Sequence, residues 1–214
     1  MDYKHKITGV SPLVWAGLAF LGFILNIILA TQGFLDRYDI EDGMRFLAEK
    51  PIVVIGAHIA YALSGVALIF MVVAFYGWRA MDTHSYLTQT ATAFGIISGT
   101  LFLISGQVGG WGGVDLLYIQ SVRSVAYVQE AYLPLTVMAN RTFAGAISVS
   151  GFWFFLTNWQ ALRSQSWPQL VSYLGLGSGV LAVSGLVLPG GLVLLGLLLG
   201  ILWAIIVGFL LLRK

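Results

Sequence analysis

The chain has 214 residues, of which 58% are hydrophobic and only 9% are charged. A typical soluble domain carries about 25% charged residues, so this composition excludes an ordinary soluble protein, and its hydrophobicity excludes a disordered one. The net charge of +2 is too small for a nucleic-acid-binding surface. The chain has no cysteine, which excludes disulfides, thiolate zinc sites and iron–sulfur ligation. A multi-pass helical membrane protein remains.

Six segments are long and apolar enough to cross, or nearly cross, a hydrocarbon core about 30 Å thick, which requires about 20 helical residues. The runs are continuous rather than alternating, which argues against a transmembrane β-barrel. The predicted fold is an all-α, six-helix transmembrane bundle that forms a single domain over residues 1–214. Its spans are expected at about residues 12–31, 52–76, 91–109, 134–159, 169–188 and 191–212.

The basic residues give a weak preference for one orientation, because Lys and Arg concentrate in cytoplasmic loops. With the N-terminus in the cytoplasm, the inner side holds Lys4, Lys6, Arg79, Arg163, Arg213 and Lys214. The outer side then holds Arg37, Arg45, Lys50, Arg123 and Arg141. We therefore favour an arrangement in which both termini are cytoplasmic.

This topology places two long segments, residues 33–50 and 113–133, on the same outer side. In the second, apolar and polar residues alternate at helical spacing, which is typical of a helix in the membrane interface or of one that caps the bundle. The preceding run, Gly109–Gly113, has the sequence Gly-Gly-Trp-Gly-Gly and is expected to be a flexible connector around an interfacial Trp111. We expect short interfacial helices in both outer loops.

Small residues recur within the predicted spans, where they allow helix backbones to approach closely in lipid. Gly95–Gly99 and Gly196–Gly200 are GxxxG pairs. We expect tight packing within the chain, and the alternative is association with other membrane protein subunits through the same faces. Ser-Gly dipeptides begin at Ser64, Ser98, Ser105, Ser150, Ser178 and Ser184.

His58 is the only histidine within a predicted span. The structural interpretation is a neutral imidazole that forms a hydrogen bond inside the bundle. The functional alternative is a cofactor-binding residue, an axial ligand to haem or chlorophyll. A haem with two histidine ligands would need a second such residue, which the spans do not contain.

Arg141 and Asn140 lie near the outer part of the fourth span, and Gln107 lies beside the glycine-rich run. An arginine at this depth extends to the headgroups, pairs with an acid or binds an anionic solute. We take Arg141, Asn140 and Gln107 as candidate ligand-binding residues. Asn26 and Asn158 are expected to form hydrogen bonds between helices.

Acidic residues are absent from every predicted span. Proton-coupled transporters and intramembrane aspartyl proteases depend on carboxylates at membrane depth, so both classes are disfavoured. The sequence predicts no catalytic residue and no metal site.

The segment from Arg163 to Gly175 carries a resemblance, through Pro168, Leu170, Leu174, Gly175 and Gly177. It resembles the proline-initiated helix start of a bacterial family of integral membrane proteins catalogued as a domain of unknown function. The order of features over nearly the whole chain is similar. The resemblance implies about six helices and a bacterial inner membrane, and it supplies no activity. The same segment has a local interpretation, in which Ser166 caps a helix with Pro168 in its first turn and Trp167 anchors at the interface.

Three functional hypotheses follow. The first is a non-catalytic accessory or scaffold protein, or one that binds lipid or a small ligand, with membrane lipid as its expected partner. The second is a transporter or channel-like carrier of a neutral or anionic solute that uses Arg141. The third is a haem- or pigment-binding subunit that uses His58.

Overall fold

The computed structural model describes residues 3–31, 39–77, 85–122, 125–187 and 191–213, and all regular structure within them is helical. The all-α class is therefore confirmed. In these residues the chain forms seven helices: α1 (Tyr3–Thr31), α2 (Ile40–Glu49), α3 (Pro51–Tyr76), α4 (Tyr86–Val122), α5 (Val125–Ser164), α6 (Gln169–Ser184) and α7 (Gly191–Leu212).

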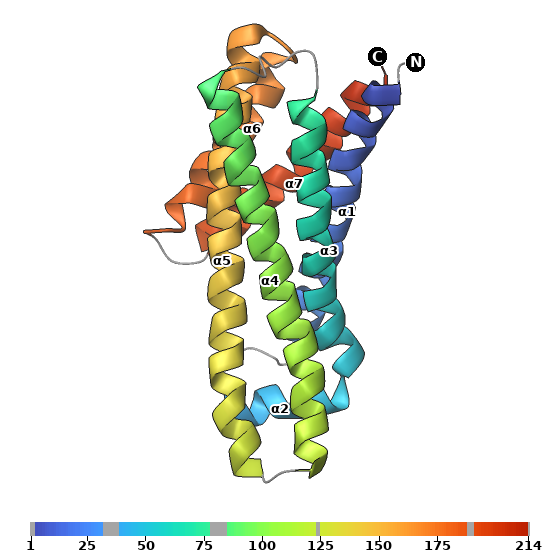
Figure 1. Ribbon diagram of the computed structural model, residues 1–214, viewed down its shortest axis with the longest axis vertical. Helices are drawn as coiled ribbons and strands as arrows, with labels where there is room; N and C mark the ends of the chain where they lie inside the picture. Colours follow the sequence, from blue (N-terminus) through green and yellow to red (C-terminus); the bar gives the residue numbers. More distant parts are fainter. Residues whose placement is uncertain (1–2, 32–38, 78–84, 123–124, 188–190, 214) are drawn as a thin grey trace.

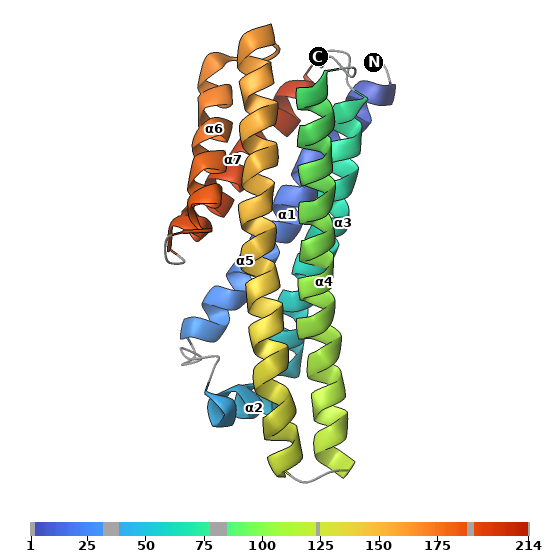
Figure 2. The ribbon, with the colours of Figure 1, turned by 60° about the vertical axis from the view of Figure 1, so that its left-hand side comes forward.

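The helices form an elongated bundle with two different ends (Figure 1). Both termini lie side by side at one end, which we call the terminal end, and the short α2 lies across the other, which we call the α2 end. Helices α4 and α5 run the full length of the bundle, whereas α6 and α7 pack near the terminal end only (Figure 2). Helix α7 closes the bundle by packing on α1 as well as on α6.

Four helices are long and apolar enough to cross a membrane: α1 from Lys6 to Thr31, α3, α4 and α7. Helix α6 has 16 residues, fewer than the roughly 20 that a full crossing requires. Helix α5 is the longest of the described helices at 40 residues, but its sequence is more polar than those of the four candidate spans. All six predicted spans therefore overlap helices, and four of those helices have the composition of a membrane span.

Helix α2 is the first of the two predicted interfacial helices, and its N-terminus is capped. The backbone N–H of Asp42 donates a hydrogen bond of 3.0 Å to the side chain of Asp39, which satisfies one of the free donors of the first turn. Met44, Phe46 and Leu47 are buried on one face of α2. The helix is therefore amphipathic, as expected.

The prediction of a second interfacial helix is wrong, and so is the prediction of a flexible connector before it. Helix α4 continues through Gly109–Gly113 to Val122, and α5 begins at Val125. The glycines serve close packing instead, because a Cβ atom on Gly109 would collide with the imidazole of His58. A Cβ atom on Gly113 would lie 3.3 Å from Leu47.

Paired glycines bring neighbouring helices into backbone contact. A Cβ atom on Gly65 of α3 would collide with the carbonyl oxygen of Gly99 of α4, and one on Gly99 would lie 2.7 Å from the carbonyl oxygen of Gly65. Gly151 of α5 and Gly179 of α6 form the same reciprocal pair at 2.7 Å in both directions. The predicted tight packing within the chain is confirmed.

Three of the serines in the Ser-Gly dipeptides link these helices further. The hydroxyl groups of Ser98 and Ser105 in α4 each donate a hydrogen bond of 2.8 Å to α5, to the carbonyl oxygens of Ala146 and Ala139. Ser178 of α6 donates a bond of the same length to a carbonyl oxygen of α7. In lipid such bonds contribute about 0.6 kcal/mol each.

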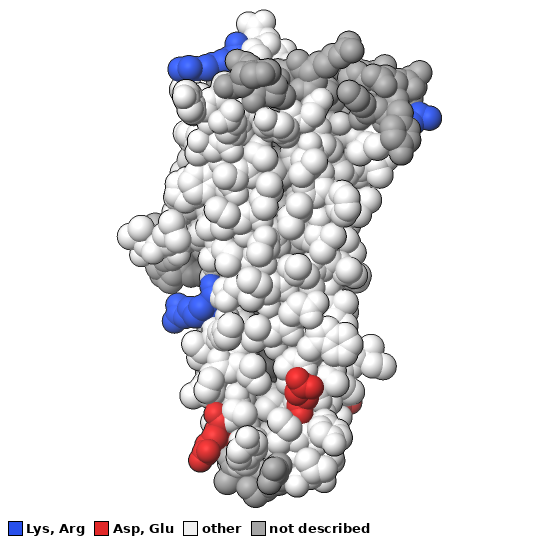
Figure 3. Space-filling model, in the orientation of Figure 1, with Lys and Arg blue, Asp and Glu red and all other residues white. Residues whose placement is uncertain are grey.

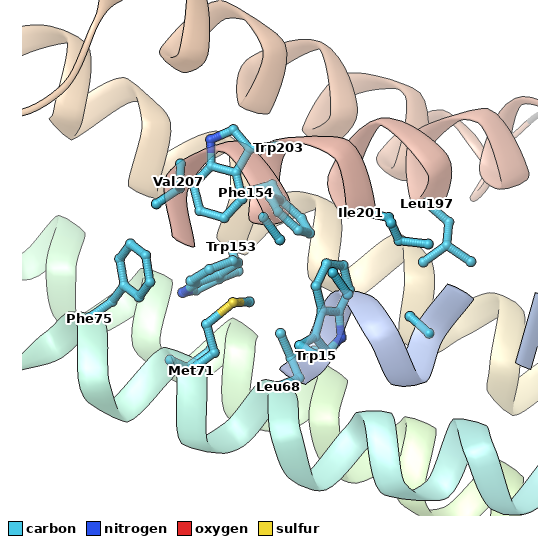
Figure 4. Close-up of a cluster of buried hydrophobic side chains, with 14 of the residues drawn as sticks. Trp15, Leu68, Met71, Phe75, Trp153, Phe154, Leu197, Ile201, Trp203 and Val207 are labelled. Carbon is cyan, nitrogen blue, oxygen red and sulfur yellow. The ribbon is translucent and has the colours of Figure 1, made fainter. Parts of the chain in front are cut away.

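An aromatic core fills the bundle toward the terminal end (Figure 4). Trp153 and Trp203 are almost fully buried, with ring centroids 5.9 Å apart in an edge-to-face arrangement. The indole N–H of Trp203 donates a hydrogen bond of 2.8 Å to the side-chain oxygen of Asn158, which links α7 to α5. The interhelical role predicted for Asn158 is therefore confirmed.

The segment that begins α6 differs from its prediction in two respects. Helix α6 starts at Gln169 with Pro168 as its N-cap, and no side-chain hydrogen bond caps it, so the predicted cap by Ser166 is wrong. Trp167 is buried rather than interfacial, and its ring centroid lies 5.8 Å from those of Phe75 and Trp203. The aromatic core accounts for this, because it offers the indole a larger apolar contact than the membrane surface.

Candidate functional site

Acidic side chains are concentrated at one end of the bundle, where Arg45 and Lys50 also lie. Within the described ranges, every acidic residue lies at the α2 end: four in or beside α2, Asp115 near the end of α4 and Glu130 near the start of α5. The opposite end carries Lys6, Arg163 and Arg213, and the surface between the two ends is largely, but not wholly, uncharged (Figure 3). The ends of the bundle therefore differ in electrostatic potential.

Apart from Asn158, which lies in the aromatic core, the polar residues that the sequence singled out lie at one level of the bundle. Gln160 of α5, near the terminal end, donates hydrogen bonds of 2.9 and 2.7 Å to the hydroxyls of Ser85 and Thr88. Asn140 is 20 positions earlier in α5, which corresponds to about 30 Å of helix. A hydrocarbon core that begins at the level of Gln160 would thus end at that of Asn140.

Cross-helix contacts extend this level to the neighbouring helices. Ser105 of α4 bonds to Ala139, the residue before Asn140, and the imidazole of His58 on α3 lies against Gly109 of α4. On α1, the side-chain N–H of Asn26 donates to the hydroxyl of Tyr61 at 3.2 Å. The predicted interhelical role of Asn26 is therefore confirmed. Four helices place polar residues at a common depth, about one hydrocarbon thickness from the terminal end.

A cavity of about 60 Å³ lies between this level and α2. A buried water molecule requires about 10–15 Å³ of such space, so the cavity has room for a few. Helices α1, α2, α3, α4 and α5 all contribute to its wall. Its polar lining consists of Asn26, His58, Tyr132, Thr136 and Asn140, and no Lys, Arg, Asp or Glu is among the described residues that line it.

Helix α2 covers this cavity, which we call the α2-end cavity. A Cβ atom on Gly43 would collide with the hydroxyl of Tyr132, so only glycine allows α2 to approach α5 this closely. Leu47 of α2 packs with Leu116 and Val128 in a small apolar cluster that also contains Tyr132. Apolar contacts therefore hold the cover in place.

The structure brings together two of the four predicted site residues. His58 and Asn140 line the α2-end cavity, whereas Gln107 and Arg141 are exposed and do not line it. Sequence reasoning missed Thr136 and Tyr132 as lining residues, together with the covering role of α2. Their positions in the cavity wall depend on how five helices pack against one another, and the spacing of residues in the sequence does not predict that packing.

The space around His58 does not fit a haem or chlorophyll. Sites for ligands of drug size occupy about 300–1,000 Å³, far more than the 60 Å³ present here. One side of the imidazole is already in contact with the backbone of Gly109. In the part of the chain that the structure describes, no group of three or more His, Cys, Asp or Glu side chains is placed to hold a metal ion.

Comparison of the chain with protein families, with curated proteins and with solved structures gave no match. The resemblance to a bacterial family of unknown function therefore stays a prediction.

Proposed function

We propose that this chain is a six-span membrane protein without catalytic activity that binds a small, uncharged polar molecule in the α2-end cavity. The observation that carries the proposal is the convergence of polar side chains from α1, α3 and α5 on one covered cavity. These side chains present amide, imidazole and hydroxyl groups from three helices to one covered space, which is the arrangement of a site for a small polar ligand.

The proposed topology follows from the path of the chain. Six crossings, by α1, α3, α4, α5, α6 and α7, return the C-terminus to the side of the N-terminus, and both termini do lie at one end (Figure 1). The charged side chains described at that end are basic, which favours a cytoplasmic location under the positive-inside rule. The α2 end is then outside, and the family resemblance suggests a bacterial inner membrane.

The chemistry of the cavity limits the ligand. Because its lining carries amide, imidazole and hydroxyl groups without a carboxylate, ammonium or guanidinium, a neutral hydrogen-bonding molecule fits best. Arg141 lies outside the cavity, which removes the positive charge that an anionic solute would need. A ligand larger than a few water molecules would require α2 to move outward.

Binding is favoured over transport by the packing between the cavity and the terminal end. There α3 and α4 meet at Gly65 and Gly99 with their backbones in contact. Farther along, the rings of Trp153, Phe154 and Trp203 fill the centre of the bundle (Figure 4). A carrier would have to separate both layers in each transport cycle.

The test is mass spectrometry of small molecules that co-purify with the full-length chain in mild detergent. Thr136→Leu fills the cavity and removes a hydroxyl, whereas Thr142→Leu changes a similarly half-buried residue of α5 that does not line it. We expect an uncharged polar molecule with the wild type and with Thr142→Leu, and its loss with Thr136→Leu. The same molecules from all three proteins, or none from the wild type, would contradict the proposal.

A further inference from the structure

A second hollow lies on the outer surface between α1 and α3, toward the terminal end. It has a volume of about 500 Å³ and is almost wholly apolar. We call it the α1–α3 groove. Its walls are Val10, Val14 and Leu18 on α1 and Leu63, Val66 and Phe70 on α3.

The groove faces away from the rest of the bundle. Val14, Leu63 and Phe70 are 48%, 49% and 68% exposed, although they lie beside a tightly packed core. Helix α1 contacts α3 and α7, and no other described helix covers this side. In a membrane-spanning chain this surface meets lipid, so an apolar hollow here is open to an acyl chain.

The length of the groove matches one leaflet of a bilayer. It extends from Lys6 to Leu18 on α1, a distance of about 18 Å at 1.5 Å per residue. One leaflet supplies about 15 Å, half of a hydrocarbon core about 30 Å thick. Helix α3 runs antiparallel alongside, since the hydroxyl of Thr8 lies 3.5 Å from the carbonyl oxygen of Ala74 and, farther along α1, Asn26 bonds to Tyr61.

Positive charge lies at the open end of the groove. Lys6 is both exposed and part of the groove wall. Arg213, also exposed, is the residue after Leu212, whose side chain packs against Gly9 of α1. The acidic side chains of the described residues are all at the opposite end of the bundle. An anionic headgroup at this position would therefore meet attraction, and none of the described carboxylates lies nearby to oppose it.

We infer that the α1–α3 groove binds one phospholipid with an anionic headgroup. One acyl chain lies along the groove, and Lys6 contacts the phosphate. This site is separate from the α2-end cavity at the other end of the bundle. It depends on the proposal that the chain spans a membrane, and not on what the cavity binds.

The test is native mass spectrometry of the full-length chain with added phosphatidylglycerol or phosphatidylcholine that carry the same acyl chains. Val14→Trp fills the groove from its open side. Val73→Trp is the matched control, because Val73 is equally exposed on α3 but does not line the groove. Lys6→Gln removes the charge alone. Leu63→Trp is a second groove-filling variant, to be used where Val14→Trp does not fold.

The wild type and Val73→Trp are expected to retain one phosphatidylglycerol in preference to phosphatidylcholine. Filling the groove should weaken this binding about tenfold, the loss expected when roughly two methylene groups are no longer buried. Lys6→Gln should weaken binding of phosphatidylglycerol about fivefold and leave that of phosphatidylcholine unchanged. Equal retention by the groove-filling variants and the control would overturn the inference. So would equal binding of both lipids by the wild type, or a protein dimer that is lost when the groove is filled.

Discussion

The two ends of the bundle are built by the same chain but are packed differently. Toward the terminal end, six helices surround a core in which Trp153 and Trp203 are almost fully buried and Asn158 is hydrogen-bonded to both α5 and α7. Toward the α2 end, α6 and α7 are missing (Figure 2) and the remaining helices leave a cavity with a polar lining. The comparison shows that the candidate site lies where the bundle has too few helices to fill its own interior.

The largest effect on stability is expected from Gly65→Ala. The added methyl group collides with backbone atoms of α4 rather than with a flexible side chain, so α3 and α4 must separate. Overpacking of this kind costs about 1–3 kcal/mol, and we expect the upper part of that range. The measurement is the free energy of unfolding in detergent.

Gly145→Ala is the matched control for this change. No atom lies within 4 Å of a Cβ atom placed on Gly145, which is also within a long helix. Replacement of glycine by alanine there should leave stability unchanged or raise it by up to about 1 kcal/mol. If both variants lose equal stability, close backbone packing does not hold α3 and α4 together.

Asparagine substitutions compare the two ends directly. Asn158→Ala leaves the buried indole N–H of Trp203 without its acceptor, which should cost about 1–3 kcal/mol. Asn26→Ala, beside the cavity, should cost less because water can replace the lost group at the hydroxyl of Tyr61. Chemical denaturation of both variants tests this order, and the reverse order would show that the cavity is dry.

Gly43→Ala should open the α2-end cavity while changing stability only by about 1 kcal/mol, because Tyr132 and α2 can both shift. The chain has no cysteine, so a single Thr136→Cys reports on access to the cavity from the α2 end. We expect a charged thiol reagent to label it several times faster when Gly43→Ala is present. Gly177→Ala, at a position with open space around it, should not change the rate. An unchanged rate with Gly43→Ala would show that α2 does not cover the cavity.

The smallest effects are expected at the serines that bridge helices. Ser178→Ala and Ser105→Ala each remove one hydrogen bond to a neighbouring carbonyl oxygen, at a cost of about 0.6 kcal/mol. Thermal unfolding of the two variants should show similar small shifts. Ser184→Ala is the control, because the hydroxyl of Ser184 bonds within its own helix. A loss of several kcal/mol at either bridging position would mean that polar bonds, rather than close packing, stabilise the bundle.

Much of the fold followed from local patterns. Long apolar runs predicted the helices, and the recurring small residues predicted tight packing between them. The predicted flexible connector at Gly109–Gly113 is wrong, because these glycines lie within α4 and allow close packing. The imidazole of His58 and the side chain of Leu47 lie against this run, and these contacts involve residues more than 40 positions away. Contacts between residues so far apart cannot be predicted from the local pattern of a single sequence.

The candidate site was likewise predictable from the sequence only in part. Composition alone marks His58 and Asn140 as unusual, because a polar group at the edge of the hydrocarbon needs a partner whatever the arrangement of the helices. Which polar residues face a common space depends on the rotation of each helix and on where α2 folds back. Gln107 and Arg141, equally conspicuous in the sequence, face outward, and Thr136 faces inward. The apolar content of the chain thus accounts for its helices and for its four candidate membrane spans. The cavity exists because α6 and α7 end short of α2, a consequence of packing among helices distant in the chain.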